Sequence, residues 1–246
     1  NKRWQTDWKD LVFIKGDLSD NILEKMNVEI LGDPEKFTDV NPEAYELYLK
    51  GKYLFSNRES FNDVEVARDL LREAIKIDTD LLIAHNFLGL IYVNYGEYEK
   101  AKDILLPTLI KAEDRNDHGN IANALNTIGI IYGAQNSPDT ALIYYERCLA
   151  TWKQLGNKMG EAIVYNNIGN IHYKQKNFPK ALQCYNKSLK YRQRLNDSLG
   201  IGTAMNNIGC VFFQDKDYNK AINHFEKALS IRKKVDNKIG ISESLQ

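Results

Sequence analysis

Histidine, cysteine and carboxylate side chains are the residues of this chain that could hold a metal ion or catalyse proton transfer. The chain has four histidines and three cysteines, but no histidine has a cysteine or carboxylate three or four residues further along, the spacing typical of zinc ligands on a helix. The sequence also lacks the GxxxxGK[ST], GxGxxG and GxSxG patterns that bind nucleotides or present a catalytic serine. We therefore predict no metal site, no cofactor and no catalytic residue within this chain.

The residues with a regular spacing are asparagines. Asn86, Asn126, Asn166 and Asn206 recur every 40 residues. A carboxamide donates and accepts hydrogen bonds at the same time, so a row of them could hold the backbone of an extended peptide. Alternatively, each asparagine bonds to the neighbouring repeat and fixes the arrangement of the repeats. The sequence leaves both interpretations open.

These asparagines belong to an internal repeat of 40 residues, in which small and apolar residues also recur. The recurring positions are Gly89, Gly129, Gly169 and Gly209; Ala101, Ala141, Ala181 and Ala221; and Leu109, Leu149, Leu189 and Leu229. Within one copy, apolar residues fall at i, i+3, i+4 and i+7 in two stretches separated by the polar segment KQKNFP, which predicts two antiparallel helices. We expect the glycine of the first helix to face the alanine of the second, and GNKMG and NDSLG to form turns between copies.

The repeat resembles the tetratricopeptide repeat (TPR) family. Four copies carry the family pattern, as HNFLGLIY…KAKDIL, LNTIGIIY…TALIYYERC, YNNIGNIHY…KALQCYNKS and MNNIGCVFF…KAINHFEKA. The usual TPR period is 34 residues, so a period of 40 indicates longer helices. The resemblance implies an all-α TPR solenoid, a right-handed superhelix of antiparallel helix pairs, with a short N-terminal capping segment.

The chain is expected to contain five repeats and the start of a sixth. We predict a linker or capping segment over 1–39, with an amphipathic helix whose apolar stripe includes Leu18 and Ile22 and a short strand near Trp4–Phe13. The predicted repeats follow in order: a degenerate TPR 1 over 40–80, TPR 2 over 81–117, TPR 3 over 118–157, TPR 4 over 158–197, TPR 5 over 198–237, and the start of a sixth over 238–246.

The TPR resemblance implies a binding groove, because in these arrays the face that carries Asn166 lines the concave side. We expect a protein or peptide ligand there, contacted by Asn86, Asn126, Asn166, Asn206, Asn123, Asn170, Tyr173, Lys174, Phe213 and Gln214. The clamp with which some TPR proteins hold chaperone carboxylates needs lysine and arginine on this face. The matching positions here hold Ile83, Asn86, Asn123, Asn126 and Ile163, so that clamp is not evident.

The N-terminal part carries a second resemblance. Trp8, Phe13, Ile14, Asp17, Ile22 and the run 41–51 resemble the join between a TolB-like segment and the TPRs of bacterial class III adenylate/guanylate cyclase-type signalling proteins. This implies an interaction or sensory module attached to an output domain outside the chain. The alternatives are a freestanding scaffold, or the TPR segment of a histidine kinase or transcriptional regulator.

Composition limits the partners further. Lys+Arg and Asp+Glu are equal at 33 each, so no net basic charge favours nucleic acid or an anionic membrane. Three cysteines without CxxC spacing favour a reducing, cytoplasmic compartment. The open ends of a solenoid also offer a route to homo-oligomers.

Overall fold

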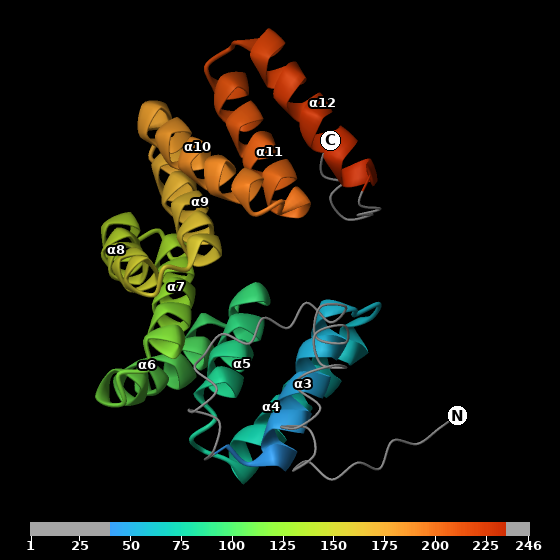
Figure 1. Cartoon of the computed structure of the whole chain (residues 1–246), viewed down its shortest axis with the longest axis vertical. Coiled ribbons are helices and arrows are strands. Elements are labelled where there is room, and N and C mark those ends of the chain that lie inside the picture. The colour runs from blue at the N-terminus through green and yellow to red at the C-terminus, as the bar shows by residue number, and fades with distance from the viewer. Residues whose placement is uncertain (1–39, 235–246) are drawn as a thin grey trace. The chain divides into compact units, whose positions relative to one another are not determined.

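The computed structural model of the chain describes residues 40–234 and is entirely helical over that range (Figure 1). The predicted all-α fold of paired helices is therefore confirmed. The predicted helix and strand within 1–39 and the start of a sixth repeat at 238–246 lie outside the described residues. The chain divides after Ile104 into two compact units, and each is described by itself.

The first unit contains α3 (Pro42–Ser56), α4 (Phe61–Ile77), α5 (Leu82–Asn94) and the beginning of α6 (Tyr98–Asp114). Local sequence accounts for the helix starts: the Asn41 side chain caps α3, and Ser60 forms a capping box at the start of α4. Phe87 of α5 packs edge-on against two rings of α3, Tyr48 and Phe55. These contacts bury the apolar side of α3 against its neighbours.

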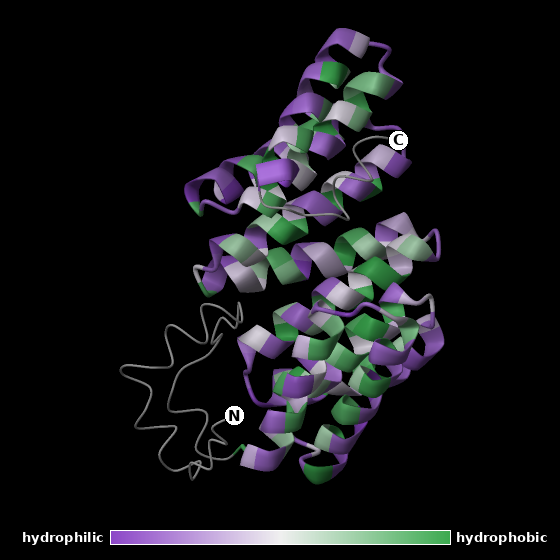
Figure 2. Ribbon diagram, turned by 90° about the vertical axis from the view of Figure 1, so that its right-hand side faces the viewer, coloured by the Kyte–Doolittle hydropathy of each residue, from purple (hydrophilic) through white to green (hydrophobic). Residues whose placement is uncertain are grey.

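The second unit contains the rest of α6 and three helix pairs, in which α7 packs on α8, α9 on α10, and α11 on α12. The helices are α7 (His118–Ala134), α8 (Pro138–Gln154), α9 (Lys158–Lys174), α10 (Phe178–Arg194), α11 (Ser198–Gln214) and α12 (Tyr218–Lys234), each of 17 residues. Contacts of α8 with α9 and of α10 with α11 join the pairs. Hydrophobic and hydrophilic residues alternate along each helix (Figure 2), as expected for helices that bury one side.

The turns between copies differ from the prediction, because Gly160 and Gly200 lie inside α9 and α11. The turn residue with positive φ is instead Gly156 or Asn196, followed by an N-cap whose side chain accepts the amide of Gly160 or Gly200. A Cβ on Gly160 would meet the Trp152 ring at 2.5 Å, and one on Gly200 would overlap the Arg192 guanidinium. Both glycines therefore make room for a side chain of the preceding helix.

The repeated glycine of the first helices also has a different partner from the predicted alanine. A Cβ on Gly169 would lie 2.5 Å from the ring of Tyr185, and a Cβ on Gly129 would lie 2.6 Å from that of Tyr145. Gly209 stands in the same relation to Phe225, at 2.7 Å. The glycine therefore provides the space into which the aromatic ring of the second helix fits.

Candidate functional site

A pocket of about 450 Å³ opens in the second unit between the first helices of its three pairs. This volume falls within the range of ligand pockets, about 300–1,000 Å³. We call it the asparagine pocket. Its lining residues are Ile130, Gly133, Ala134, Tyr145, Asn167, Asn170, Ile171, Tyr173, Lys174, Tyr185, Asn207 and Cys210.

The inner part of the asparagine pocket is apolar and uncharged. Tyr145 and Tyr185 are buried, and this burial raises the pKa of both hydroxyls, so they remain protonated at neutral pH. The Tyr185 hydroxyl donates to Asn170 Oδ1 at 2.8 Å, which fixes the orientation of that carboxamide. Burial also raises the pKa of the Cys210 thiol. The pocket therefore offers apolar surface and fixed hydrogen-bonding groups to a ligand.

Lys174 is the one residue with a formal charge among those that line the pocket. Its Nζ donates to the Gly133 carbonyl at 3.1 Å, which links α9 to the C-terminal end of α7. The side chain is exposed, and an ammonium has two further donors to offer. A ligand can thus meet one positive charge at the edge of an otherwise neutral pocket.

The asparagine ladder is only partly as predicted. Asn126 Oδ1 accepts from Asn167 Nδ2 at 2.9 Å, and Asn166 Oδ1 accepts from Asn207 Nδ2 at 2.9 Å. We call these two pairs the asparagine junctions, because each joins the first helices of neighbouring pairs. Asn206 instead places its Nδ2 4.0 Å from Cys210 Sγ on its own helix.

Asn167 and Asn207 are pocket residues that sequence reasoning missed. The repeated dipeptide Asn-Asn at 166–167 and 206–207 was the available signal. The first asparagine of each dipeptide was taken for the ladder, whereas the second one lines the pocket. Of the predicted residues, Asn170, Tyr173 and Lys174 line the pocket as well.

The other predicted site residues lie elsewhere. Asn86 is buried in α5 of the first unit. Asn123 is half-buried, and its backbone carbonyl accepts from the Thr127 hydroxyl. Phe213 and Gln214 are exposed at the end of α11, where Phe213 packs edge-on against Tyr218. The asparagine pocket does not include these four residues.

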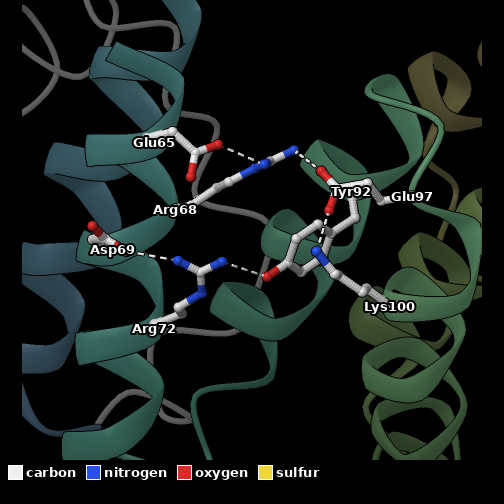
Figure 3. A network of polar contacts seen from close by, with 7 residues as sticks. All are labelled: Glu65, Arg68, Asp69, Arg72, Tyr92, Glu97 and Lys100. Carbon is white, nitrogen blue, oxygen red and sulfur yellow. Dashed lines mark hydrogen bonds and ion pairs between the residues drawn. The ribbon is translucent and has the colours of Figure 1, made fainter. Parts of the chain in front are cut away.

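A network of charged residues in the first unit is the other concentration of polar groups (Figure 3). The Arg68 side chain is almost fully buried, and its guanidinium binds Glu65 at 2.6 Å and Glu97 at 2.5 Å. It also lies 5.0 Å from the ring centre of Tyr92. Lys100 binds the second oxygen of Glu97 at 2.6 Å.

Arg72 extends this network, binding Asp69 and donating to the Tyr92 hydroxyl at 2.8 Å. Each of the three cations in Figure 3 therefore has a carboxylate partner. Paired charges of this kind are poorly placed to bind an anionic ligand. The network instead fixes α4 against the end of α5 and the start of α6.

The histidines pack against neighbouring rings and helices. His224 stacks on Phe212 with ring centres 5.5 Å apart, and burial lowers its pKa. His172 is half-buried in α9. Within residues 40–234, no three histidine, cysteine or acidic side chains come together in a group that could hold a metal ion. In the same range, no helix is long and apolar enough to cross a lipid bilayer.

Comparison with known proteins places this fold. The family model described as tetratricopeptide repeat matches residues 80–154 and 160–234. No curated protein matches the sequence significantly. Among solved structures, BtubC from P. vanneervenii is similar with a TM-score of 0.64 and 21% identity, over 78% of this chain and 81% of that one.

Two further solved structures are similar at the level of fold. The apo form of RapI has a TM-score of 0.65 and 18% identity, over 80% of this chain and 72% of that one. NprR in complex with its cognate peptide NprX has a TM-score of 0.67 and 16% identity, over 97% of this chain and 67% of that one. At these identities the likeness concerns the helical fold.

Proposed function

The chain belongs to the tetratricopeptide repeat family, and on that basis we propose that it binds a peptide segment of a partner in the asparagine pocket. The observation that carries the proposal is the composition of this pocket, which combines an apolar interior with carboxamides at its edge. A peptide presents the same two features, apolar side chains and a regular row of backbone donors and acceptors. NprR, which shares the fold, has been solved with a bound peptide.

Selection from a displayed library of random octapeptides tests this proposal. We expect the described protein to enrich peptides, and fluorescence anisotropy of a labelled, selected peptide to give a micromolar or tighter Kd. Asn170→Ala and Tyr173→Ala should each weaken that affinity, because they remove one hydrogen-bonding group and one ring at the pocket. Asn223→Ala is the matched control, since Asn223 is exposed on α12 and does not line the pocket.

Two outcomes would contradict peptide binding in the pocket. One is a library that yields no enriched peptide. The other is a selected peptide whose affinity is the same for Asn170→Ala, Tyr173→Ala and Asn223→Ala, because such a peptide binds elsewhere on the chain.

We further propose that this binding serves a multidomain bacterial signalling protein located in the cytoplasm. The support is the resemblance of residues 8–51 to the segment that precedes TPRs in cyclase-type proteins. Repeats that contact only their neighbours can pass a change in spacing along the array to an attached domain. The chain would then bias an output domain when peptide binds.

The test of this role is the gene on both sides of the chain. If it encodes a cyclase domain, cyclic nucleotide synthesis by the full protein should change on addition of the selected peptide. A gene without any catalytic or regulatory domain beside the repeats would favour the freestanding scaffold. A kinase or a DNA-binding domain would favour the other two alternatives.

A further inference from the structure

The two asparagine junctions have the same direction. In each, the asparagine of the earlier helix accepts through Oδ1 and that of the later helix donates through Nδ2, at 2.9 Å in both cases. The partners are 41 residues apart in each junction, so the geometry repeats from one helix pair to the next. All four side chains are half-buried.

Each junction leaves one donor group and one acceptor group for a ligand. Within residues 40–234, the Nδ2 groups of Asn126 and Asn166 and the Oδ1 atoms of Asn167 and Asn207 take part in no hydrogen bond. A carbonyl and an amide of a peptide backbone are the complement of this pair. The bond inside the junction holds both carboxamides in place, so little side-chain freedom is lost when a ligand binds.

The spacing between junctions relates to the length of an extended peptide. The junctions lie one repeat apart on neighbouring first helices, and packed helix axes are typically about 8–10 Å apart. An extended chain advances about 3.3 Å per residue, so one repeat corresponds to about three residues.

Resting on the proposed peptide binding, we propose that the junctions bind the backbone of an extended peptide at two residues three positions apart. The Asn126–Asn167 junction holds the first and the Asn166–Asn207 junction the second. Because Asn167 and Asn207 both line the asparagine pocket, an apolar side chain between the two anchored residues enters it and contacts Tyr145 and Tyr185. The ligand is thus an extended peptide recognised by its backbone with a period of three.

A backbone scan of the octapeptide selected from the library tests this spacing. Each residue in turn is N-methylated, which removes one backbone donor and leaves the side chains unchanged. We expect affinity to fall about tenfold or more at two positions separated by three residues, and much less at the others.

Two protein variants assign the positions to the junctions. Asn167→Thr and Asn207→Thr each remove one acceptor, and threonine is native at the equivalent position 127, where its hydroxyl bonds within its own helix. In Asn167→Thr, N-methylation at the first sensitive position should no longer reduce affinity, while the second position stays sensitive. Asn207→Thr should give the reverse result. Circular dichroism checks that both variants remain folded.

The possible results separate this proposal from the proposed function. A peptide that needs Asn170 and Tyr173, but shows no pair of sensitive positions three residues apart, overturns the backbone spacing and leaves peptide binding intact. The same holds if neither threonine variant changes the pattern of the scan. A library that yields no peptide overturns both.

Discussion

Gly169→Ala tests the proposed fit between the first-helix glycine and the second-helix ring. A Cβ at Gly169 would lie 2.5 Å from Tyr185, whereas ordinary contact begins at 3.4 Å, so the ring would have to move by 0.9 Å. The ring has little freedom to do so, because it is 2% exposed and packs with Ile208 and Val211. Its hydroxyl is also bonded to Asn170.

The expected size follows from two opposing effects. Overpacking of a core costs about 1–3 kcal/mol, and the enclosed ring places this site near the upper value. Replacing glycine by alanine inside a helix returns about 1 kcal/mol. The net loss should be about 2 kcal/mol, which for a chain of this size lowers the Tm by about 4–8 °C. Thermal unfolding followed by circular dichroism at 222 nm measures it.

Gly202→Ala is the matched control, because it makes the same change in α11 without the clash. A Cβ there would meet its nearest atom, in the Arg232 side chain, at 3.5 Å. Only the gain in helix propensity remains, so the Tm should rise by about 2–4 °C.

A second background identifies the ring as the cause. In Tyr185→Leu, which copies the leucine at the equivalent position 105, Gly169→Ala should no longer lower the Tm. If Gly169→Ala raises the Tm of the native chain as Gly202→Ala does, the assignment of this contact is wrong.

Three further outcomes are expected. Acid should weaken the first unit, because Lys100 and then Arg68 lower the pKa of Glu97, and the resulting stability is complete above about pH 4.5 and is lost as pH falls through the lowered value; Glu97→Gln should flatten the pH dependence of amide exchange in α4. Burial raises the pKa of the Cys148 thiol to about 12, so iodoacetamide should label it only after unfolding, and rapid labelling of the folded chain would contradict its burial. EDTA should leave the Tm unchanged, because His172 and His224 serve packing, and unfolding by the chelator would refute that role.

The helix pairs could be predicted because the sequence repeats the same local signals. Apolar spacing indicates each helix, and capping residues such as Asn157 and Asp197 mark helix starts independently of the rest of the fold. The all-helical fold is confirmed for this reason. The role of Gly160 was wrong because a glycine near a turn usually belongs to it, and only the neighbouring helix brings Trp152 to that point.

The asparagine pocket could be predicted only in part, because it depends on the rotation of each helix. Adjacent residues point about 100° apart around a helix, so Asn166 and Asn167 face different neighbours. The repeat indicates that both are important, but not which one reaches the next helix pair as a donor. That is set by the packing of α9 against its neighbours, a property of the tertiary structure.

The uniform helices of the second unit have a consequence for how such a chain can change over time. From α7 to α12, every helix has 17 residues and begins 20 residues after the one before it. An in-frame duplication of one 40-residue segment would therefore insert a complete helix pair with its own turns and caps. Each such event would add one junction and, with it, about three residues to the ligand that can be read. The length of the recognised peptide would then evolve in fixed steps, without any need to rebuild the core.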